Sequence, residues 1–266
     1  MTRLATKNKD VKLTTIDRTP NTKFVDKLSS YITECSKDGH GRIAILSNYF
    51  KNFTGGKFEF FGDNNPFKIT TDDIVAVTML SMEIRYSTRS GITPRTILSL
   101  MEHQEHIEAL LRRLQDNRSS SPTSSTLETL SEEELSGLLT GETSAAQELV
   151  SFLFPLFSQV KVSESKKWVA VSKLLSRKRP GLLPIRDNKV ATRLGYSMPM
   201  SQNSYLADWW TDWHWAITAN ENMHIKNRLS ELQAQLAEDK ELEFVPSLIR
   251  IADVLVWNGC TCNSIR

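Results

Sequence analysis

The spacing of the apolar residues constrains the fold of this chain more than any other feature of its sequence. In most segments between residues 22 and 257 these residues recur every three or four positions, which places them on one face of an α-helix. Alternation of apolar and polar residues, the pattern of a half-buried strand, is scarce throughout. The sequence therefore predicts a mainly α-helical fold, with many helices packed into a globular structure.

Start and stop signals refine this pattern. Thr70 and Asp73 resemble a capping box in which aspartate replaces the usual glutamate. Pro94 stands at a favoured place just inside a helix, and Gly195 stands at the usual place after a helix end. Helices are expected over residues 22–35, 72–82, 95–115, 131–139, 144–157, 166–177, 187–194, 204–218, 220–237 and 246–257.

Segments rich in glycine, proline or serine divide the chain into parts. Residues 48–66 are aromatic and glycine-rich, which predicts a short aromatic loop or hairpin. The run RSSSPTSST at 118–126 predicts a flexible connection. One integrated domain over residues 21–258 is the alternative to separate parts. The expected parts are a flexible tail (1–20), an N-terminal helical part (21–117), a linker or loop (118–130), a C-terminal helical part (131–258) with a hairpin-like element (160–195), and a second tail (259–266).

Composition excludes several classes of protein. Apolar residues make up 39% and charged residues 24% of the chain, values typical of a globular protein. The longest apolar runs fall short of the ~20 residues that cross a bilayer, and the polar N-terminus lacks the apolar centre of a signal peptide. Three cysteines cannot form a disulfide framework. We therefore expect a cytoplasmic protein without membrane contact.

Positive charge is concentrated in one stretch of the sequence. Residues 161–195 contain ten lysines and arginines against two acidic residues, a net charge of +8 in a chain whose total is +2. A concentrated basic patch attracts polyanions even on a near-neutral protein, so the stretch predicts contact with a polyanion such as a nucleic acid. The alternative is a solvated face compensated by residues 119–150, which include six glutamates and no basic residue.

A helix over residues 166–177 would separate apolar from basic side chains. Lys166, Lys173 and Arg177 fall on the side opposite its apolar stripe, and a row of cations can follow the phosphates of a nucleic acid. The apolar stripe consists of Trp168, Val171, Leu174 and Leu175. The expected nucleic-acid-binding residues are Lys166, Lys167, Ser172, Lys173, Arg177, Lys178, Arg179, Arg186 and Lys189.

The sequence VSKLLSRKRPGLLPIRD at residues 171–187, the signature segment below, closely resembles a signature of a bacterial family of uncharacterised proteins. Members of that family read Ala-Ser-Lys-Leu-Leu, then Arg-Pro, then Pro-Val-x-Asp. GGKFEFFG at 55–62 and ITTDDIVAVTMLS at 69–81 resemble the N-terminal half of the same family. The resemblance extends from about residue 47 to residue 257 and implies no function.

More distantly, the chain is similar to the helix-hairpin-helix DNA glycosylases. The similarity lies in the order of hairpin, helix, connector and aspartate, followed by Val-x-x-Arg-Leu-Gly at 190–195. It implies a phosphate-gripping hairpin at 163–165 and makes Asp187 the catalytic residue that assists cleavage of the base–sugar bond. This hairpin contains Glu164 and no glycine, and no lysine falls clearly at the nucleophile position of the bifunctional enzymes. The resemblance therefore implies a monofunctional, water-using reaction on an unusual or damaged base.

Such a reaction needs a carboxylate because positive charge develops on the sugar as the base departs, and a nearby carboxylate stabilises that charge or activates the attacking water. The base must also leave the stack and enter a pocket with aromatic walls, for which Trp209, Trp213 and Phe58 are the candidates. The alternatives are that Asp187 is an ordinary helix N-cap and that the two tryptophans belong to the core.

No metal and no cofactor is expected. His103 and His106 have ligand-like spacing, but no second cluster of ligand residues completes a zinc site. Three functions stay open: a DNA-associated glycosylase-like enzyme, a non-catalytic nucleic-acid-binding module, and an interaction or structural protein whose cations pair with the acidic segment or with a partner. The sequence does not indicate the oligomeric state.

Overall fold

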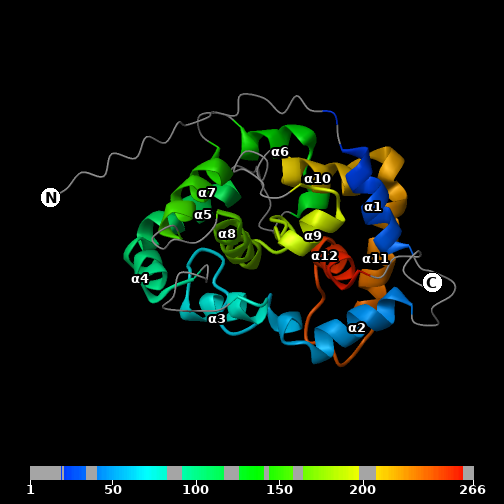
Figure 1. Ribbon diagram of the computed structural model, residues 1–266, viewed down its shortest axis with the longest axis horizontal. Helices are drawn as coiled ribbons and strands as arrows, with labels where there is room; N and C mark the ends of the chain where they lie inside the picture. The colour runs from blue at the N-terminus through cyan, green and yellow to red at the C-terminus, as the bar shows by residue number, and fades with distance from the viewer. Residues whose placement is uncertain are drawn as a thin grey trace.

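The computed structural model describes residues 19, 21–33, 41–82, 92–116, 126–140, 144–157, 164–197 and 208–259 (Figure 1). Within these residues all regular structure is helical, which confirms the predicted mainly α-helical, multi-helix fold. None of the described helices is long and apolar enough to span a membrane. The helices are α1 (Thr22–Ile32), α2 (Arg42–Asn52), η1 (Thr54–Lys57), α3 (Thr71–Met79), α4 (Pro94–Glu102), α5 (Gln104–Asp116), η2 (Leu127–Thr129), α6 (Glu132–Leu139), α7 (Ala145–Leu156), α8 (Glu164–Lys178), α9 (Asn188–Arg193), α10 (Trp210–Thr218), η4 (Asn220–Asn222), α11 (Met223–Ala237) and α12 (Leu248–Asn258).

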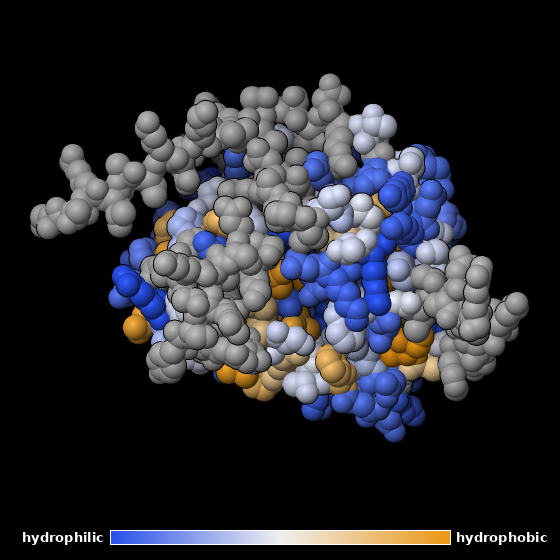
Figure 2. Space-filling view, in the orientation of Figure 1, coloured by the Kyte–Doolittle hydropathy of each residue, from blue (hydrophilic) through white to orange (hydrophobic). Residues whose placement is uncertain are grey.

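The helices form two groups that lie on opposite sides of the molecule in Figure 1. In one group α12 packs against α1, α2, α9 and α11, and in the other α7 packs against α4, α5, α6 and α8. Helix α3 packs against both α8 and η1, so the chain between α2 and α3 joins the two groups. One continuous cluster of buried apolar residues runs through both. Among the coloured residues of the face seen in Figure 2, hydrophilic ones predominate, with apolar areas near α4 and α2.

Local hydrogen bonds explain where several helices begin. The Thr70 hydroxyl accepts from the Asp73 backbone N–H while the Asp73 carboxylate accepts from the Thr70 backbone N–H, which confirms the predicted capping box of α3. Asp187 is the N-cap of α9, and its carboxylate accepts from the Lys189 backbone N–H at 2.9 Å. Gly195 and Gly259 follow α9 and α12 with φ of +95° and +80°, a backbone conformation that costs glycine little.

The structure corrects two predicted elements and adds a short turn to a third. Residues 48–52 belong to α2 and residues 54–57 to η1, so the aromatic stretch is no hairpin, and only its later part is irregular. The single helix predicted over 95–115 is two helices, because the backbone leaves the helical conformation at His103. Residues 127–129 of the predicted linker form the 3-10 turn η2, with Leu127 and Leu130 buried.

Several predictions fall outside the described residues. These are nearly all of the tails at 1–20 and 259–266, the serine-rich run up to residue 125, and residue 163 of the predicted hairpin. Residues 164 and 165 of that hairpin lie in the first turn of α8. The other predicted helices are present; where their predicted ends are described, the observed ends differ by a few residues, and residues 34–35 and 204–207 of two of them lie outside the described residues.

Candidate functional site

Helix α8 is enclosed on all sides, which corrects the predicted row of exposed cations. Every residue from Trp168 to Lys178 is buried. Among the predicted nucleic-acid-binding residues Lys167 and Arg179 are half-buried and Lys189 is exposed, while the side chain of Lys166 lies outside the described residues. The predicted residues with buried side chains are Ser172, Lys173, Arg177, Lys178 and Arg186.

Two of the buried cations are neutralised by one carboxylate from α3. Arg177 Nε lies 3.0 Å from Asp73 Oδ1, with both side chains completely buried, and Lys178 Nζ contacts Asp73 Oδ2. The guanidinium of Arg177 also donates to the carbonyls of Phe58 and Phe61. A buried charge requires a partner of opposite charge and full hydrogen bonding. This part of the basic stretch therefore holds residues 58–61 and α3 against α8 rather than facing solvent.

The signature segment folds back on itself through a buried serine. Ser172 Oγ accepts from the Arg186 backbone N–H at 3.0 Å and lies 3.4 Å from the Arg186 carbonyl. This clamp ties the connector after α8 to the middle of α8. Lys173 follows Ser172 and Asp187 follows Arg186, so this pairing also brings Lys173 and Asp187 next to each other.

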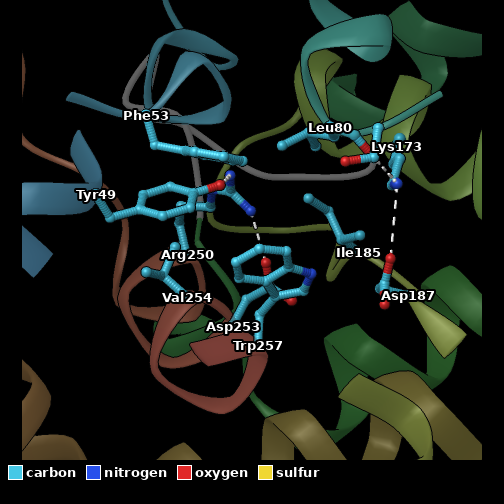
Figure 3. A pocket seen from close by; sticks show the side chains of 11 residues that line it. Tyr49, Phe53, Leu80, Lys173, Ile185, Asp187, Arg250, Asp253, Val254 and Trp257 are labelled. Carbon is cyan, nitrogen blue, oxygen red and sulfur yellow. Dashed lines mark hydrogen bonds and ion pairs between the residues drawn. The ribbon is translucent and has the colours of Figure 1, made fainter. Parts of the chain in front are cut away.

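A pocket lies where the two helical groups meet (Figure 3). Its walls come from α2, the end of α3, α8, the connector before α9, and α12. Its volume is about 30 Å³, which accommodates one or two water molecules. The residues that line it are Tyr49, Phe53, Leu80, Ser81, Lys173, Ile185, Asp187, Arg250, Asp253, Val254 and Trp257.

Lys173 and Asp187 form one polar wall of this pocket. Lys173 Nζ lies 3.6 Å from Asp187 Oδ2 and donates a hydrogen bond of 2.6 Å to the Leu80 carbonyl. Burial lowers the pKa of the Lys173 ammonium group, and the Asp187 carboxylate raises it in part. Among the described residues Ser81 is the one non-glycine residue with a positive φ, +62°. This unusual conformation directly follows the carbonyl that accepts from Lys173, and backbone strain of this kind clusters at functional sites.

The opposite polar wall comes from α12. Arg250 donates to Asp253 Oδ2 at 2.6 Å and to the Tyr49 hydroxyl at 2.8 Å. Burial raises the pKa of Asp253 to about 6; Arg250 lowers it, and Asp187 raises it further. Behind this wall, outside the pocket lining, burial raises the pKa of Glu59 to about 7, against the lowering effect of Arg250. Shifted pKa values of several groups around one cleft are typical of functional sites.

The predicted aromatic walls of a base pocket are elsewhere. Trp209, Trp213 and Phe58 are completely buried, and none of them lines the pocket. The two tryptophans pack edge-on against Phe24 in the core. Trp209 is the N-cap of α10 and Trp213 lies one helical turn later in that helix, so both rings point into the core and the alternative prediction of core residues is the correct one.

The pocket has a different aromatic rim. Phe53 is 39% exposed, and its ring centroid lies 5.8 Å from that of the half-buried Trp257. The exposed Lys189 places its amino group 4.1 Å from the centre of the Trp257 ring. One of the nine predicted nucleic-acid-binding residues thus lies exposed beside the pocket.

The sequence did contain a signal for the residues that prediction missed. Arg250 and Asp253 stand three residues apart in LIRIADVLVWN, an otherwise apolar helix whose residues 248–256 are all buried. Two opposite charges at that spacing lie on one helix face, and charges in a buried helix require a reason. Tyr49, by contrast, lay within the segment predicted as a loop or hairpin, and nothing in its sequence context indicated a pocket.

The described residues contain no group of three or more histidine, cysteine or acidic side chains able to hold a metal ion. His103 and His106 are exposed on α5 and its start, where both contact the ring of Phe152. The candidate site therefore consists of Lys173, Asp187, Arg250 and Asp253, with aromatic side chains at its rim.

Comparison with curated proteins and with solved structures gives no match. A match is found to one family model, described as a family of unknown function (DUF6308), over residues 42–259. This range includes the signature segment, the aromatic loop, α12 and every residue that lines the pocket. Since the match extends over most of the chain, the protein belongs to this family of unknown function.

Proposed function

We propose that the protein is a DNA-associated, glycosylase-like hydrolase that releases an unusual or damaged base, with Asp187 as its acidic catalyst. The observation that carries the proposal is the meeting of Lys173 and Asp187 at 3.6 Å in a pocket between two helical groups. Ligand sites form preferentially where separately packed parts of a protein meet. The resemblance of residues 160–195 to the helix-hairpin-helix glycosylases supports this class of reaction.

The geometry suits an aspartate that acts by its charge. One oxygen of Asp187 is fixed by the backbone N–H of Lys189, and the other faces Lys173, so the carboxylate has one orientation. A fixed charge beside a sugar stabilises the positive charge that develops when the base departs, without reorganisation during the reaction. Asp187 is thus both an N-cap and a pocket residue, and the two roles do not exclude each other.

The size of the pocket is our reason for proposing its rim as the position of the nucleobase. A volume of about 30 Å³ holds the attacking water and leaves no room for a nucleobase. The extruded base would therefore stack on the exposed ring of Phe53, beside Trp257, since every base can stack on an aromatic side chain. Lys189, beside Trp257, is placed to contact a neighbouring phosphate.

The test is the release of free bases from damaged DNA. Oligonucleotides containing deaminated, oxidised or alkylated bases are incubated with the protein, and released bases are measured by mass spectrometry. We expect release from at least one of them, a loss of about 100- to 1,000-fold in Asp187→Asn, and retained DNA binding. Borohydride should trap no covalent complex, because a water-using reaction forms no imine with Lys173. Salt-dependent DNA binding without any base release would support the non-catalytic nucleic-acid-binding module instead.

A further inference from the structure

The carboxylate of Asp253 has one oxygen to which no described residue donates a hydrogen bond. Oδ2 accepts from Arg250, whereas Oδ1 is buried and has no hydrogen-bond partner within the described part of the chain. The side chain is only 8% exposed, and it lines the pocket. A buried acceptor without a partner costs about 1–3 kcal/mol, so its presence in a pocket points to a ligand that donates a hydrogen bond there.

Asp187 differs from Asp253 in this respect. Its Oδ1 is occupied by the Lys189 backbone N–H, and its Oδ2 lies beside the Lys173 ammonium group. A carboxylate held in this way stabilises positive charge but has little capacity left for the proton of a water molecule. The two carboxyl groups of the pocket are therefore suited to different tasks.

We propose that the pocket binds the attacking water on Asp253 Oδ1 and that Asp253, rather than Asp187, takes the proton of this water. The proposal rests on the hydrolytic function proposed above and divides its chemistry between two residues. Asp187 stabilises the charge on the sugar and holds Lys173, while Asp253 acts as the general base that accepts the proton of the water.

The step balances as an ordinary hydrolysis. The oxygen of the water forms a bond to the sugar carbon C1′ while its proton passes to Asp253. The bond between C1′ and the base nitrogen breaks, its electron pair stays on the base, and the base takes a proton from solvent. Asp253 then returns its proton to solvent.

The surroundings of Asp253 suit a base at neutral pH. With a pKa of about 6 its carboxylate is mostly ionised at pH 7 while remaining basic enough to accept a proton. The rate should therefore rise with pH through about 6. The charged and titratable groups that influence Asp253 or lie in the same network are Arg250 on its own helix, Lys173 on α8, Asp187 before α9, Tyr49 on α2, and Glu59 after η1.

Azide separates the two roles, because this small anion attacks carbon without giving up a proton. The measured reaction is base release from the best substrate of wild-type protein, with and without sodium azide. Asp253→Asn should lose about 100- to 10,000-fold in water, regain part of that rate in azide, and form a 1-azido sugar. Asp187→Asn should not be rescued, and Glu231→Gln, on the exposed side of α11, should behave like the wild type.

A crystal structure of the wild-type protein that resolves ordered water supplies the second measurement. It should show a water molecule within hydrogen-bonding distance of Asp253 Oδ1, and the absence of such a water would overturn the proposal. This test needs only wild-type protein, so it remains valid if Asp253→Asn fails to fold. If azide rescues Asp187→Asn but not Asp253→Asn, Asp187 is the general base, and the proposal is overturned as well. If wild-type protein releases no nucleobase, the proposed function and the proton transfer to Asp253 fail together. The crystal structure then still decides whether Asp253 Oδ1 binds a water molecule.

Discussion

The buried cluster of Asp73, Arg177 and Lys178 provides a prediction whose size follows from the structure. Asp73 is completely buried; it pairs with both cations and accepts from the Thr70 backbone N–H at 2.6 Å. Asp73→Asn keeps the shape of the side chain but leaves two buried cations without a counter-charge. Removing one member of a buried ion pair costs about 3–5 kcal/mol. This is a large part of the roughly 5–15 kcal/mol that stabilises a typical domain.

Asp72→Asn is the matched control, because Asp72 lies in the same first turn of α3. It is half-buried, and its carboxylate accepts only the Asp63 backbone N–H, at 2.8 Å, among the contacts described for it. We expect it to cost about 1 kcal/mol. Urea unfolding followed by far-UV circular dichroism at pH 7 measures both variants, with an unchanged dependence on denaturant. A cost for Asp73→Asn no larger than that for Asp72→Asn would refute the buried cluster.

Three further predictions concern pH and backbone geometry. The raised pKa of Asp253, about 6 against 3.8, means that the folded protein holds this proton more tightly than the unfolded chain. Its contribution to stability is therefore present below about pH 4 and lost as the pH rises through 6, a loss of about 2–3 kcal/mol. Denaturant unfolding at pH 4.5 and 8 should show a decrease in stability that is smaller by about this amount in Asp253→Asn, while the part due to the raised pKa of Glu59 remains. Gly56→Ala should destabilise the protein by several kcal/mol, because its Cβ would lie 2.5 Å from the Tyr49 carbonyl. Gly137→Ala, whose Cβ would have nothing within 4 Å, should instead stabilise the protein by about 0.5–1 kcal/mol. Thermal unfolding compares the two variants, and equal effects would contradict the packing of α2 against η1. Ser81→Gly should relieve about 1 kcal/mol of backbone strain at φ +62° and raise the melting temperature, and a decrease would mean that the serine side chain stabilises this turn.

The helices were largely predictable because each carries its own local signal. The apolar spacing of α1, the capping residues of α3 and the proline that begins α4 act within a few residues of the helix they define. The prediction for residues 48–66 was wrong because their glycines and aromatic residues suggested a loop or hairpin, whereas burial of Tyr49 and Phe50 keeps residues 42–52 helical. Contact with distant helices decided the structure there, and local sequence does not record it.

The candidate site was predictable only at one of its walls. Asp187 and Lys173 lie in the signature segment, and the sequence predicts functional roles for both. The sequence also places Arg177, in the same segment, among the surface cations, although it is buried. Helical periodicity alone places it opposite the apolar stripe, and only the position of Asp73 on a distant helix explains why this side is buried. Asp253 was missed because a second wall formed by α12 depends on tertiary packing.

The most direct test of the proposed function separates the capping role of Asp187 from its catalytic role. Asp187→Asn and Asp187→Ala both remove the counter-charge of Lys173, but asparagine caps helices about as well as aspartate. The free energy of unfolding of Asp187→Ala should therefore be about 1 kcal/mol lower than that of Asp187→Asn. The measurement is the rate of base release by both variants under single-turnover conditions, with Asp26→Asn, on the exposed face of α1, as the control. We expect both Asp187 variants to lose about 100-fold or more while the control retains full activity. Full activity in Asp187→Asn would show that this aspartate only caps its helix and would contradict the proposed reaction.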